Sequence, residues 1–332
     1  MLDLQDVETA FAVRVVREAM RLASQVQSGM ALRGLTKSDL SPVTVADFGV
    51  QALIARALRE AFPEAVLVGE ESARDLEAPD VRPMLDLVVE FVGRFAPGAT
   101  AASVCQWIDE GLGEPGARFW TLDPIDGTKG YLRGGQYAIA LALVENGEVQ
   151  LGVLGCPNLG EHAQPDIGLG ALVVARRGQG AWLHVSGDPA DQYERLMVSP
   201  CADPVQARLF RSVEASHTNP GQIEEIEQVL GAAAEPVCMD SQAKYAALAA
   251  GQGELLLRLL SPKQPDYRER IWDQAAGSLV LEEAGGMITD LRGRPLDFSQ
   301  GRTLASNEGI FASNGILHEA GLKAIAQVCG WA

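Results

Sequence analysis

The sequence predicts a protein of mixed α and β structure, an antiparallel sheet followed by a layered α/β half. Two observations lead to this fold class. In the first half, two pairs of apolar, strand-like runs are each joined by a short glycine-containing turn, which is typical of β-hairpins. In the second half, helix-like and strand-like segments alternate, which is typical of layered α/β domains. We place the domain boundary near residue 195, which gives domains of residues 1–194 and 195–332.

The first half is expected to begin with two helices. Apolar residues recur at helical spacing from Val7 to Val26, and this spacing predicts an amphipathic helix. A second helix is predicted from about Phe48 to Ala61, after a glycine-containing break. A short buried strand over 65–68 then runs straight into Gly69-Glu70-Glu71. Residues 72–116 contain four prolines and are expected to form an insertion with one or two helices.

The remaining elements follow from short apolar runs and from helical spacing. Asn146-Gly147 between two apolar runs is a strong hairpin signal. The expected strands of the first half are 118–122, 137–144, 149–154, 171–175 and 181–185. In the second half, strands are expected near 210–213, 254–260 and 287–289, with a short apolar stretch at 236–239, and helices are expected near 221–230, 242–250 and 272–284.

The composition favours a globular enzyme and argues against several other classes. The net charge is −17, and so acidic a chain lacks the clustered Lys and Arg that long nucleic acids require. The five cysteines are scattered without a CxxC pair, which argues against a disulfide framework and against a zinc site. We see no signal peptide and no run of 18 apolar residues, so we expect a cytoplasmic protein that does not bind or span a membrane.

Acidic side chains follow two predicted strands and stand at the start of a predicted helix. Glu70 follows the strand over 65–68, Asp123 and Asp126 follow the strand over 118–122, and Asp273 begins the helix near 272–284. Carboxylates at the carboxyl ends of strands gather at one edge of a sheet. Four hard oxygen donors without His or Cys suit Mg²⁺ rather than zinc.

The segment Asp123-Pro-Ile-Asp-Gly-Thr128 has the chemistry of a turn that binds metal and phosphate. Pro124 stiffens the turn, and the Ile125 carbonyl can supply a further ligand between the two aspartates. Gly127 permits a positive φ or a close backbone approach. Thr128 opens a predicted helical turn whose N–H groups can hold a phosphate. Each motif alone has an ordinary interpretation as a turn or a helix cap; their occurrence together, in this order, favours function.

Together, these motifs resemble the inositol monophosphatase superfamily. Val68-Gly-Glu-Glu71 resembles its first metal-binding motif, and Asp123 to Thr128, with Trp272-Asp273 and Glu283-Ala-Gly-Gly286, resembles its two signatures. The resemblance covers about Lys37 to Ser313. It implies a layered α-β-α-β-α sandwich of the inositol monophosphatase and fructose-1,6-bisphosphatase type, and inhibition by lithium.

The resemblance also implies roles for individual residues. Two or three Mg²⁺ ions would be held by Glu70, Asp123, Asp126, Asp273 and the Ile125 carbonyl. Asp47, hydrogen bonded to Thr128, would align and activate the attacking water, an arrangement of the general-base kind.

A narrower resemblance is to the 3'(2'),5'-bisphosphate nucleotidases. It is carried by Thr128 to Tyr137, by Asp240 to Tyr245, by the region of Arg258 and by the long insertion before Arg118. These enzymes of sulfur metabolism remove the 3'-phosphate of adenosine 3',5'-bisphosphate and leave AMP; many also accept the sulfated nucleotide PAPS, and some accept inositol 1,4-bisphosphate. The implied partner is therefore a small bisphosphorylated nucleotide. The implied substrate-binding residues are Gly127, Thr128, His217, Ser241, Lys244 and Arg258, with the last two at the 5'-phosphate.

Two other functions stay open at this point. A phosphatase acting on inositol phosphate or fructose 1,6-bisphosphate would use the same metal site, but a monophosphate needs no second anion clamp such as Lys244 and Arg258. A non-catalytic nucleotide sensor would be expected to have lost a metal ligand, and none is lost. Residues 261–267, with two prolines, form a slightly longer segment than in relatives. They border the expected pocket and bear on substrate preference.

Overall fold

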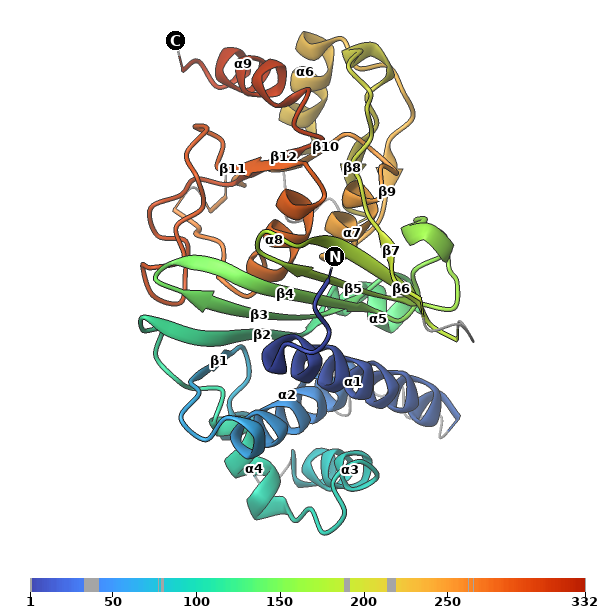
Figure 1. Ribbon diagram of the computed structural model, residues 1–332, viewed down its shortest axis with the longest axis vertical. Helices are drawn as coiled ribbons and strands as arrows, with labels where there is room; N and C mark the ends of the chain where they lie inside the picture. Colours follow the sequence, from blue (N-terminus) through green and yellow to red (C-terminus); the bar gives the residue numbers. More distant parts are fainter. Residues whose placement is uncertain are drawn as a thin grey trace.

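The computed structural model describes residues 2–32, 42–76, 78, 81–187, 192–213, 219–261, 263–264 and 266–331. These residues form alternating layers of helices and sheets (Figure 1). Helices α6 (Pro220–Leu230) and α9 (His318–Val328) cover the outer face of a five-stranded sheet. Helices α7 (Ala243–Ala249) and α8 (Ala275–Glu283) lie between this sheet and a seven-stranded sheet. The predicted α-β-α-β-α sandwich is confirmed.

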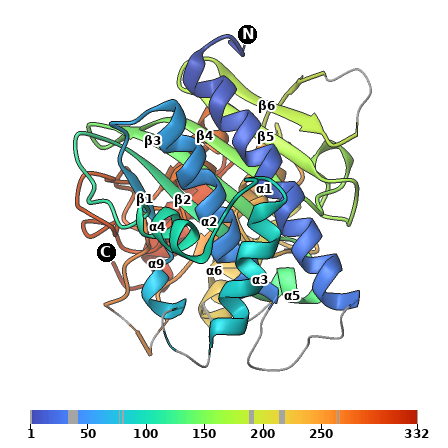
Figure 2. The same cartoon turned by 90° about the horizontal axis from the view of Figure 1, so that it is seen from below.

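The fifth layer consists of helices α1 (Val7–Leu32) and α2 (Pro42–Ala61), which run across the other face of the seven-stranded sheet (Figure 2). The strands of this sheet follow the chain order from β1 to β7. The first pair is parallel and every later pair is antiparallel. The strands are β1 (Leu67–Gly69), β2 (Arg118–Asp126), β3 (Ala138–Glu145), β4 (Glu148–Cys156), β5 (Ala171–Arg176), β6 (Gly180–Val185) and β7 (Glu194–Arg195).

Both predicted hairpins are present in this sheet. The turn between β3 and β4 contains Asn146 at φ 51° and Gly147 at φ 80°, and two residues of positive φ are what a two-residue hairpin turn needs. Both faces of β3 are buried. Its larger side chains belong to the core under α1 and α2, whereas its alanines belong to the core under α8, and these small side chains allow that helix to approach closely.

The insertion over 72–116 covers the free edge of the seven-stranded sheet. It contains the short 3₁₀ helix η1 (Ala73–Leu76) and helices α3 (Arg82–Gly93) and α4 (Ala101–Asp109), so the predicted helices are confirmed. After α4 the chain returns along β1, where Gly69 N donates to the Gly111 carbonyl at 2.7 Å and Gly113 N donates to the Leu67 carbonyl at 3.0 Å. The insertion thus satisfies an edge that would otherwise be open to pairing with another chain.

The five-stranded sheet has the order β11-β12-β10-β8-β9. Its strands are β8 (Leu209–Arg211), β9 (Val237–Cys238), β10 (Leu255–Arg258), β11 (Met287–Thr289) and β12 (Ile310–Ser313). The sequence patterns predicted β8, β10 and β11. Strand β9 lies within the apolar stretch at 236–239, which was not assigned to a strand, and β12 and helix α9 were missed. The two sheets divide between β7 and β8, close to residue 195; the division into two domains stays a prediction.

Three predicted element boundaries were wrong, and each affects the site. Helix α2 begins at Pro42 rather than near Phe48, because proline suits the first turn of a helix, so Asp47 lies inside the helix. Strand β2 continues to Asp126 rather than ending at 122, with a register shift after Asp123, where Pro124 has no N–H to pair. Helix α8 begins at Ala275 rather than at 272, so Asp273 precedes it.

Candidate active site

The parallel pair of β1 and β2 brings the first two predicted acids together. Gly69 lies opposite Leu122 in the register, so Glu70 and Asp123 leave the two strands at the same edge of the sheet. The backbone beside Glu70 is fixed by Gln51, a fully buried residue of α2. Its side-chain oxygen accepts from the Glu71 N–H at 3.0 Å, and its amide nitrogen donates to the Glu71 carbonyl at 2.7 Å.

A sharp corner joins β2 to the short helix α5 (Thr128–Arg133), as the sequence predicted. Gly127 forms this corner with φ 89°, and a Cβ atom there would lie 2.8 Å from the Cβ of Ser241. Only glycine therefore lets the start of α7 approach so closely. A carboxylate oxygen of Asp126 accepts from the backbone N–H of Gln242, which ties the corner to that helix, and Thr128 is exposed as the first residue of α5.

A pocket of about 650 Å³ lies where these segments meet. Glu70, Asp123 and Asp126 come from the first half of the chain, and Asp273 joins them from the second half together with the cations Lys244 and Arg258. Two predicted residues are not among those that line it. Asp47 is half-buried within α2, and His217 lies outside the described residues. The predicted site residues that line the pocket are Glu70, Asp123, Ile125, Asp126, Gly127, Thr128, Ser241, Lys244, Arg258 and Asp273.

The acidic side of the pocket is crowded with carboxylates of different exposure: Asp123 is buried, Asp126 and Asp273 are half-buried, and Glu70 is exposed. Burial raises the pKa of Asp123 well above its usual value, and the charges of Asp126, Glu70 and Asp273 raise it further. Burial also raises the pKa of Asp47, with added effects from Glu71 and Glu70. Such mutual repulsion is relieved by a proton or by a cation, so this side of the pocket favours cations.

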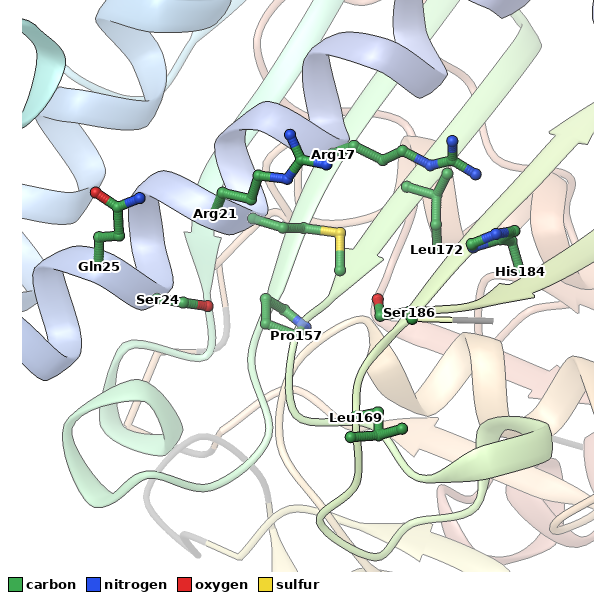
Figure 3. A pocket seen from close by; sticks show the side chains of 11 residues that line it. Arg17, Arg21, Ser24, Gln25, Pro157, Leu169, Leu172, His184 and Ser186 are labelled. Atoms are coloured by element: carbon green, nitrogen blue, oxygen red, sulfur yellow. The ribbon is translucent and has the colours of Figure 1, made fainter. Parts of the chain in front are cut away.

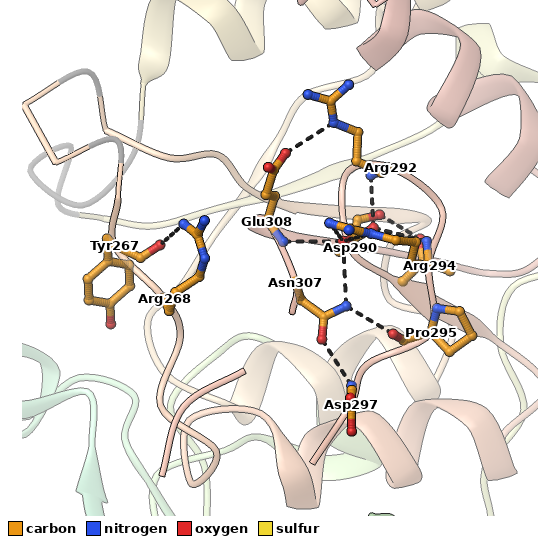
Figure 4. Close-up of polar contacts among 10 residues, drawn as sticks. Tyr267, Arg268, Asp290, Arg292, Arg294, Pro295, Asp297, Asn307 and Glu308 are labelled. Carbon is orange, nitrogen blue, oxygen red and sulfur yellow. Dashed lines mark hydrogen bonds and ion pairs between the residues drawn. The ribbon is translucent and has the colours of Figure 1, made fainter. Parts of the chain in front are cut away.

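One oxygen of this cluster identifies it as a fit for a metal ion. Asp123 is 3% exposed, and its buried Oδ1 atom has no hydrogen-bond partner among the described residues. Another buried carboxylate, that of Asp290 far along the chain, is satisfied entirely by the protein (Figure 4). Its donors are Arg292 N, Arg294 N and Nε, Asn307 Nδ2 and Glu308 N, at 2.8 to 3.5 Å.

This contrast, together with a donor set made only of hard oxygens, fits Mg²⁺. The carboxylates line one pocket but do not surround a single point. Among the described residues, no three acidic, histidine or cysteine side chains are arranged closely enough to hold a metal ion together. The assignment of individual ligands stays a prediction.

The basic side of the pocket holds two cations, Lys244, which is buried, and Arg258, whose side chain is 33% exposed. Lys244, 8% exposed on α7, donates from Nζ to Ser212 Oγ at 3.0 Å. Arg258 ends β10 and forms an ion pair with Glu269. Burial lowers the pKa of Lys244 to about 8, and the charge of Arg258 is the next cause, so the two cations lie close together. Both also act on the carboxyl of Asp126, which places them next to the acidic side.

Comparison with known proteins decides the family of this chain. A family model described as the inositol monophosphatase family matches residues 3–328. The chain belongs to the inositol monophosphatase family. Members of this family generally depend on Mg²⁺.

Among its relatives in this family, the 3'(2'),5'-bisphosphate nucleotidase of Emericella nidulans is 40% identical over 97% of this chain and 98% of that protein. The enzyme of the same name from Oryza sativa is 41% identical over 96% of this chain and 93% of that protein. An inositol monophosphatase structure from Thermotoga maritima has a TM-score of 0.64 at 23% identity, over 98% of both chains, and shows the shared fold.

Some features of this inositol monophosphatase site were not predictable from its motifs. Ser241 has φ 67°, a left-handed conformation that is rare outside glycine and is often found at functional sites. Gln242 is buried and joins the two helices of the middle layer: its side chain donates to the Trp272 carbonyl at 2.9 Å and accepts from Gly277 N at 3.1 Å. The one available signal was the position of Gln242 beside the Asp240-Ser241 motif.

Asp47 and Thr128 lie differently from the prediction. No hydrogen bond joins them in the part of the chain that the structure describes. Asp47 is held within α2 beside the charges of Glu70 and Glu71, while Thr128 is exposed at the start of α5 and lines the pocket. A direct hydrogen bond between them is therefore not part of this arrangement.

A second pocket of about 540 Å³ lies beside α1 and the loop that follows β4 (Figure 3). Arg17, Arg21 and His184 line it with apolar side chains, and it contains no Asp or Glu. It also contains none of the predicted site residues, so the family's metal chemistry does not belong there.

In the described ranges of the chain, no helix is both long and apolar enough to cross a bilayer.

Proposed function

We propose that this chain is a Mg²⁺-dependent 3'(2'),5'-bisphosphate nucleotidase that hydrolyses the 3'-phosphate of adenosine 3',5'-bisphosphate to give AMP and phosphate. The observation that carries the proposal is the presence of an acidic cluster and of the cations Lys244 and Arg258 in one pocket. The full-length similarity to proteins named 3'(2'),5'-bisphosphate nucleotidase supports it. PAPS, which has a 3'-phosphate next to a sulfated 5' end, is a second proposed substrate.

The acidic side of the pocket would receive the phosphate that is cleaved. Glu70, Asp123, Asp126 and Asp273, with the Ile125 carbonyl, would hold two or three Mg²⁺ ions. When bound, these ions neutralise the charge of the phosphate oxygens and lower the pKa of a coordinated water. We assign the orientation of the attacking water to the Thr128 hydroxyl and the acceptance of its proton to Asp47. The water oxygen forms a bond to phosphorus as the bond from phosphorus to the 3'-oxygen breaks, the 3'-oxygen takes a proton from solvent water, and the nucleotide leaves as AMP.

The basic side of the pocket would receive the second phosphate of the substrate. Lys244 is buried and Arg258 is half-buried, and charge-assisted hydrogen bonds to phosphate are strong where water is largely excluded. Ser241 would contact the nucleotide from the corner that it forms with Gly127. We also propose that His217 contacts the substrate, and this assignment rests on the sequence resemblance alone.

A phosphatase specific for inositol phosphate or fructose 1,6-bisphosphate is the alternative. The solved structures with the same fold that are named inositol monophosphatases favour the shared metal chemistry. An inositol monophosphate, however, has no second phosphate for Lys244 and Arg258 to bind. The cation pair therefore favours a substrate with two phosphates.

A panel of substrates tests the proposed function. Phosphate release is measured with Mg²⁺ on adenosine 3',5'-bisphosphate, PAPS, fructose 1,6-bisphosphate and inositol 1-phosphate. We expect the highest kcat/KM for adenosine 3',5'-bisphosphate, with AMP as the nucleotide product. A higher kcat/KM on the sugar or inositol phosphate would replace the nucleotidase proposal with the alternative.

The pH dependence should report on Lys244. Because burial lowers the pKa of Lys244 to about 8, this side chain is charged below pH 8 and loses its charge as the pH rises through that value. The kcat/KM for adenosine 3',5'-bisphosphate should then fall above pH 8, by up to about tenfold per pH unit, while that for 3'-AMP, which lacks the second phosphate, should fall less.

Lys244→Arg is the matched variant for this prediction, because arginine stays charged throughout this range. It should remove the difference between the two pH profiles. Parallel profiles for the two substrates in the wild-type enzyme would show that Lys244 does not meet the second phosphate.

A further inference from the structure

Arg258 is held from one side by a buried carboxylate, that of Glu269. Arg258 Nε donates to Glu269 Oε1 at 3.2 Å, and Nη2 lies 2.9 Å from Oε2. Glu269 is only 5% exposed, whereas the Arg258 side chain is 33% exposed, so the pair is buried on the side of the carboxylate and open to the pocket on the side of the guanidinium. A carboxylate that accepts from two guanidinium nitrogens fixes the plane of the guanidinium as well as its position.

Glu269 is itself held in place from two directions. Its Oε2 accepts from the Gln274 side chain at 2.9 Å, and the Gln274 oxygen accepts from the Tyr245 hydroxyl. Its backbone carbonyl accepts from Leu304 N at 2.9 Å. Tyr245 directly follows Lys244 on α7, so this buried network joins Arg258 to the helix that carries Lys244.

The geometry of this pair leaves part of Arg258 available to a ligand. The contact with Glu269 uses Nε and one N–H of Nη2, and no hydrogen bond to Nη1 is present among the described residues. Arg258 also lines the pocket. The other edge of the guanidinium can therefore donate to an anion, in the two-pronged manner that suits phosphate.

Glu269 also competes with the acidic side of the pocket. Asp273 and Asp126 lie close enough to Arg258 for their charges to interact with it. Without Glu269, the nearest carboxylates for this guanidinium would be these two proposed metal ligands. A buried arginine takes a carboxylate partner where one is in reach, so an unheld Arg258 would turn toward them.

We propose that Glu269 is a positioning residue, which holds Arg258 toward the second phosphate of the substrate and away from Asp126 and Asp273. This inference rests on the proposed function, because it assigns the second phosphate to Arg258. In this proposal, Glu269 contributes to the preference for bisphosphorylated substrates although it does not itself touch the substrate.

Glu269→Gln tests the proposal, since it keeps the size of the side chain and removes its charge. We expect kcat/KM for adenosine 3',5'-bisphosphate to fall by about tenfold or more, and that for 3'-AMP to fall clearly less, so that the ratio of the two decreases. The Mg²⁺ concentration for half-maximal activity should rise. AMP carries the 5'-phosphate that Arg258 is proposed to bind, and adenosine lacks it. The difference between the affinities of the enzyme for these two ligands, measured by calorimetry without turnover, should therefore be smaller in Glu269→Gln than in the wild type.

Glu254→Gln is the matched control. Glu254 is 1% exposed and pairs with Arg208 in the same two-pronged way, with Nε to Oε2 at 3.3 Å and Nη2 to Oε1 at 3.0 Å, but neither residue lines the active-site pocket. This variant should lower the melting temperature and leave the ratio between the two substrates unchanged.

Three results separate the possible outcomes. Equal losses on both substrates for Glu269→Gln, or the same behaviour as Glu254→Gln, would overturn the positioning role. Combining Glu269→Gln with Arg258→Ala should change the ratio no further than Arg258→Ala alone, and an additional change would also overturn it. If Glu269→Gln does not fold, Glu269→Asp, which keeps the charge at a shorter reach, should still lower the ratio. The proposed function is tested separately by the wild-type enzyme: if it does not prefer adenosine 3',5'-bisphosphate, the proposed function itself is wrong.

Discussion

Asp126→Asn is expected to lower kcat/KM by at least about 100-fold, because a carboxylate that faces the cleaved phosphate would lose the charge that holds a catalytic cation. Asparagine can keep the structural contact of this residue, since its side-chain oxygen can still accept from the Gln242 N–H that Asp126 binds. The loss should therefore appear in activity rather than in stability. Steady-state rates at several Mg²⁺ concentrations, with a thermal melt of the variant, provide the measurement.

Asp203→Asn is the control for this substitution. Asp203 is exposed, caps a short 3₁₀ turn through Val205 N and does not line the pocket, so the same chemical change there should leave the rate within about twofold of the wild type. Chelation of Mg²⁺ should abolish the wild-type activity. Full activity in excess chelator, or a wild-type rate for Asp126→Asn, would end the metal hypothesis.

Thr128→Ala and Asp47→Asn are expected to lower kcat by about 100-fold or more, with little change in KM. Both residues are proposed to act on the attacking water rather than on the bound substrate, so their loss should affect the chemical step. Because they serve one water, the double variant should be little slower than the slower single variant.

Thr121→Ala is a suitable control for the threonine change. Thr121 lies on the same strand that leads to the site, but its hydroxyl is buried and donates to the Val68 carbonyl at 3.0 Å. This control should lose some stability and keep its kcat. If Thr128→Ala or Asp47→Asn kept the wild-type kcat, the assignment of that residue to the water would be wrong.

The sequence contained most of the site because its signals are local. Residues at strand ends can be read from short apolar runs, and the parallel pairing of β1 with β2 then places Glu70 beside Asp123. The hairpin at Asn146-Gly147 is local in the same sense, because the turn needs positive φ at both residues.

The features that the sequence did not reveal depend on contacts between distant segments. The left-handed conformation of Ser241 follows from its packing against Gly127, more than a hundred residues earlier. The pairing of Arg258 with Glu269 requires a loop to fold back on β10. Strand β12 is short, and it is specified by pairing with β10 and β11 on its two sides rather than by its own pattern.

The alanine-rich face of β3 has a consequence for the chain while it is being synthesised. The seven strands of the first sheet are complete by Arg195, but α7 and α8, which cover this face, emerge only after about fifty and eighty further residues. For that interval a nascent chain carries a large sheet with one bare side. The larger apolar side chains of this side come from other strands of the sheet and include Phe119, Leu154 and Leu183. Because Ala138, Ala140 and Ala142 expose far less apolar area than leucine would, β3 adds little to this exposed surface, which lowers the risk of aggregation before the second half arrives.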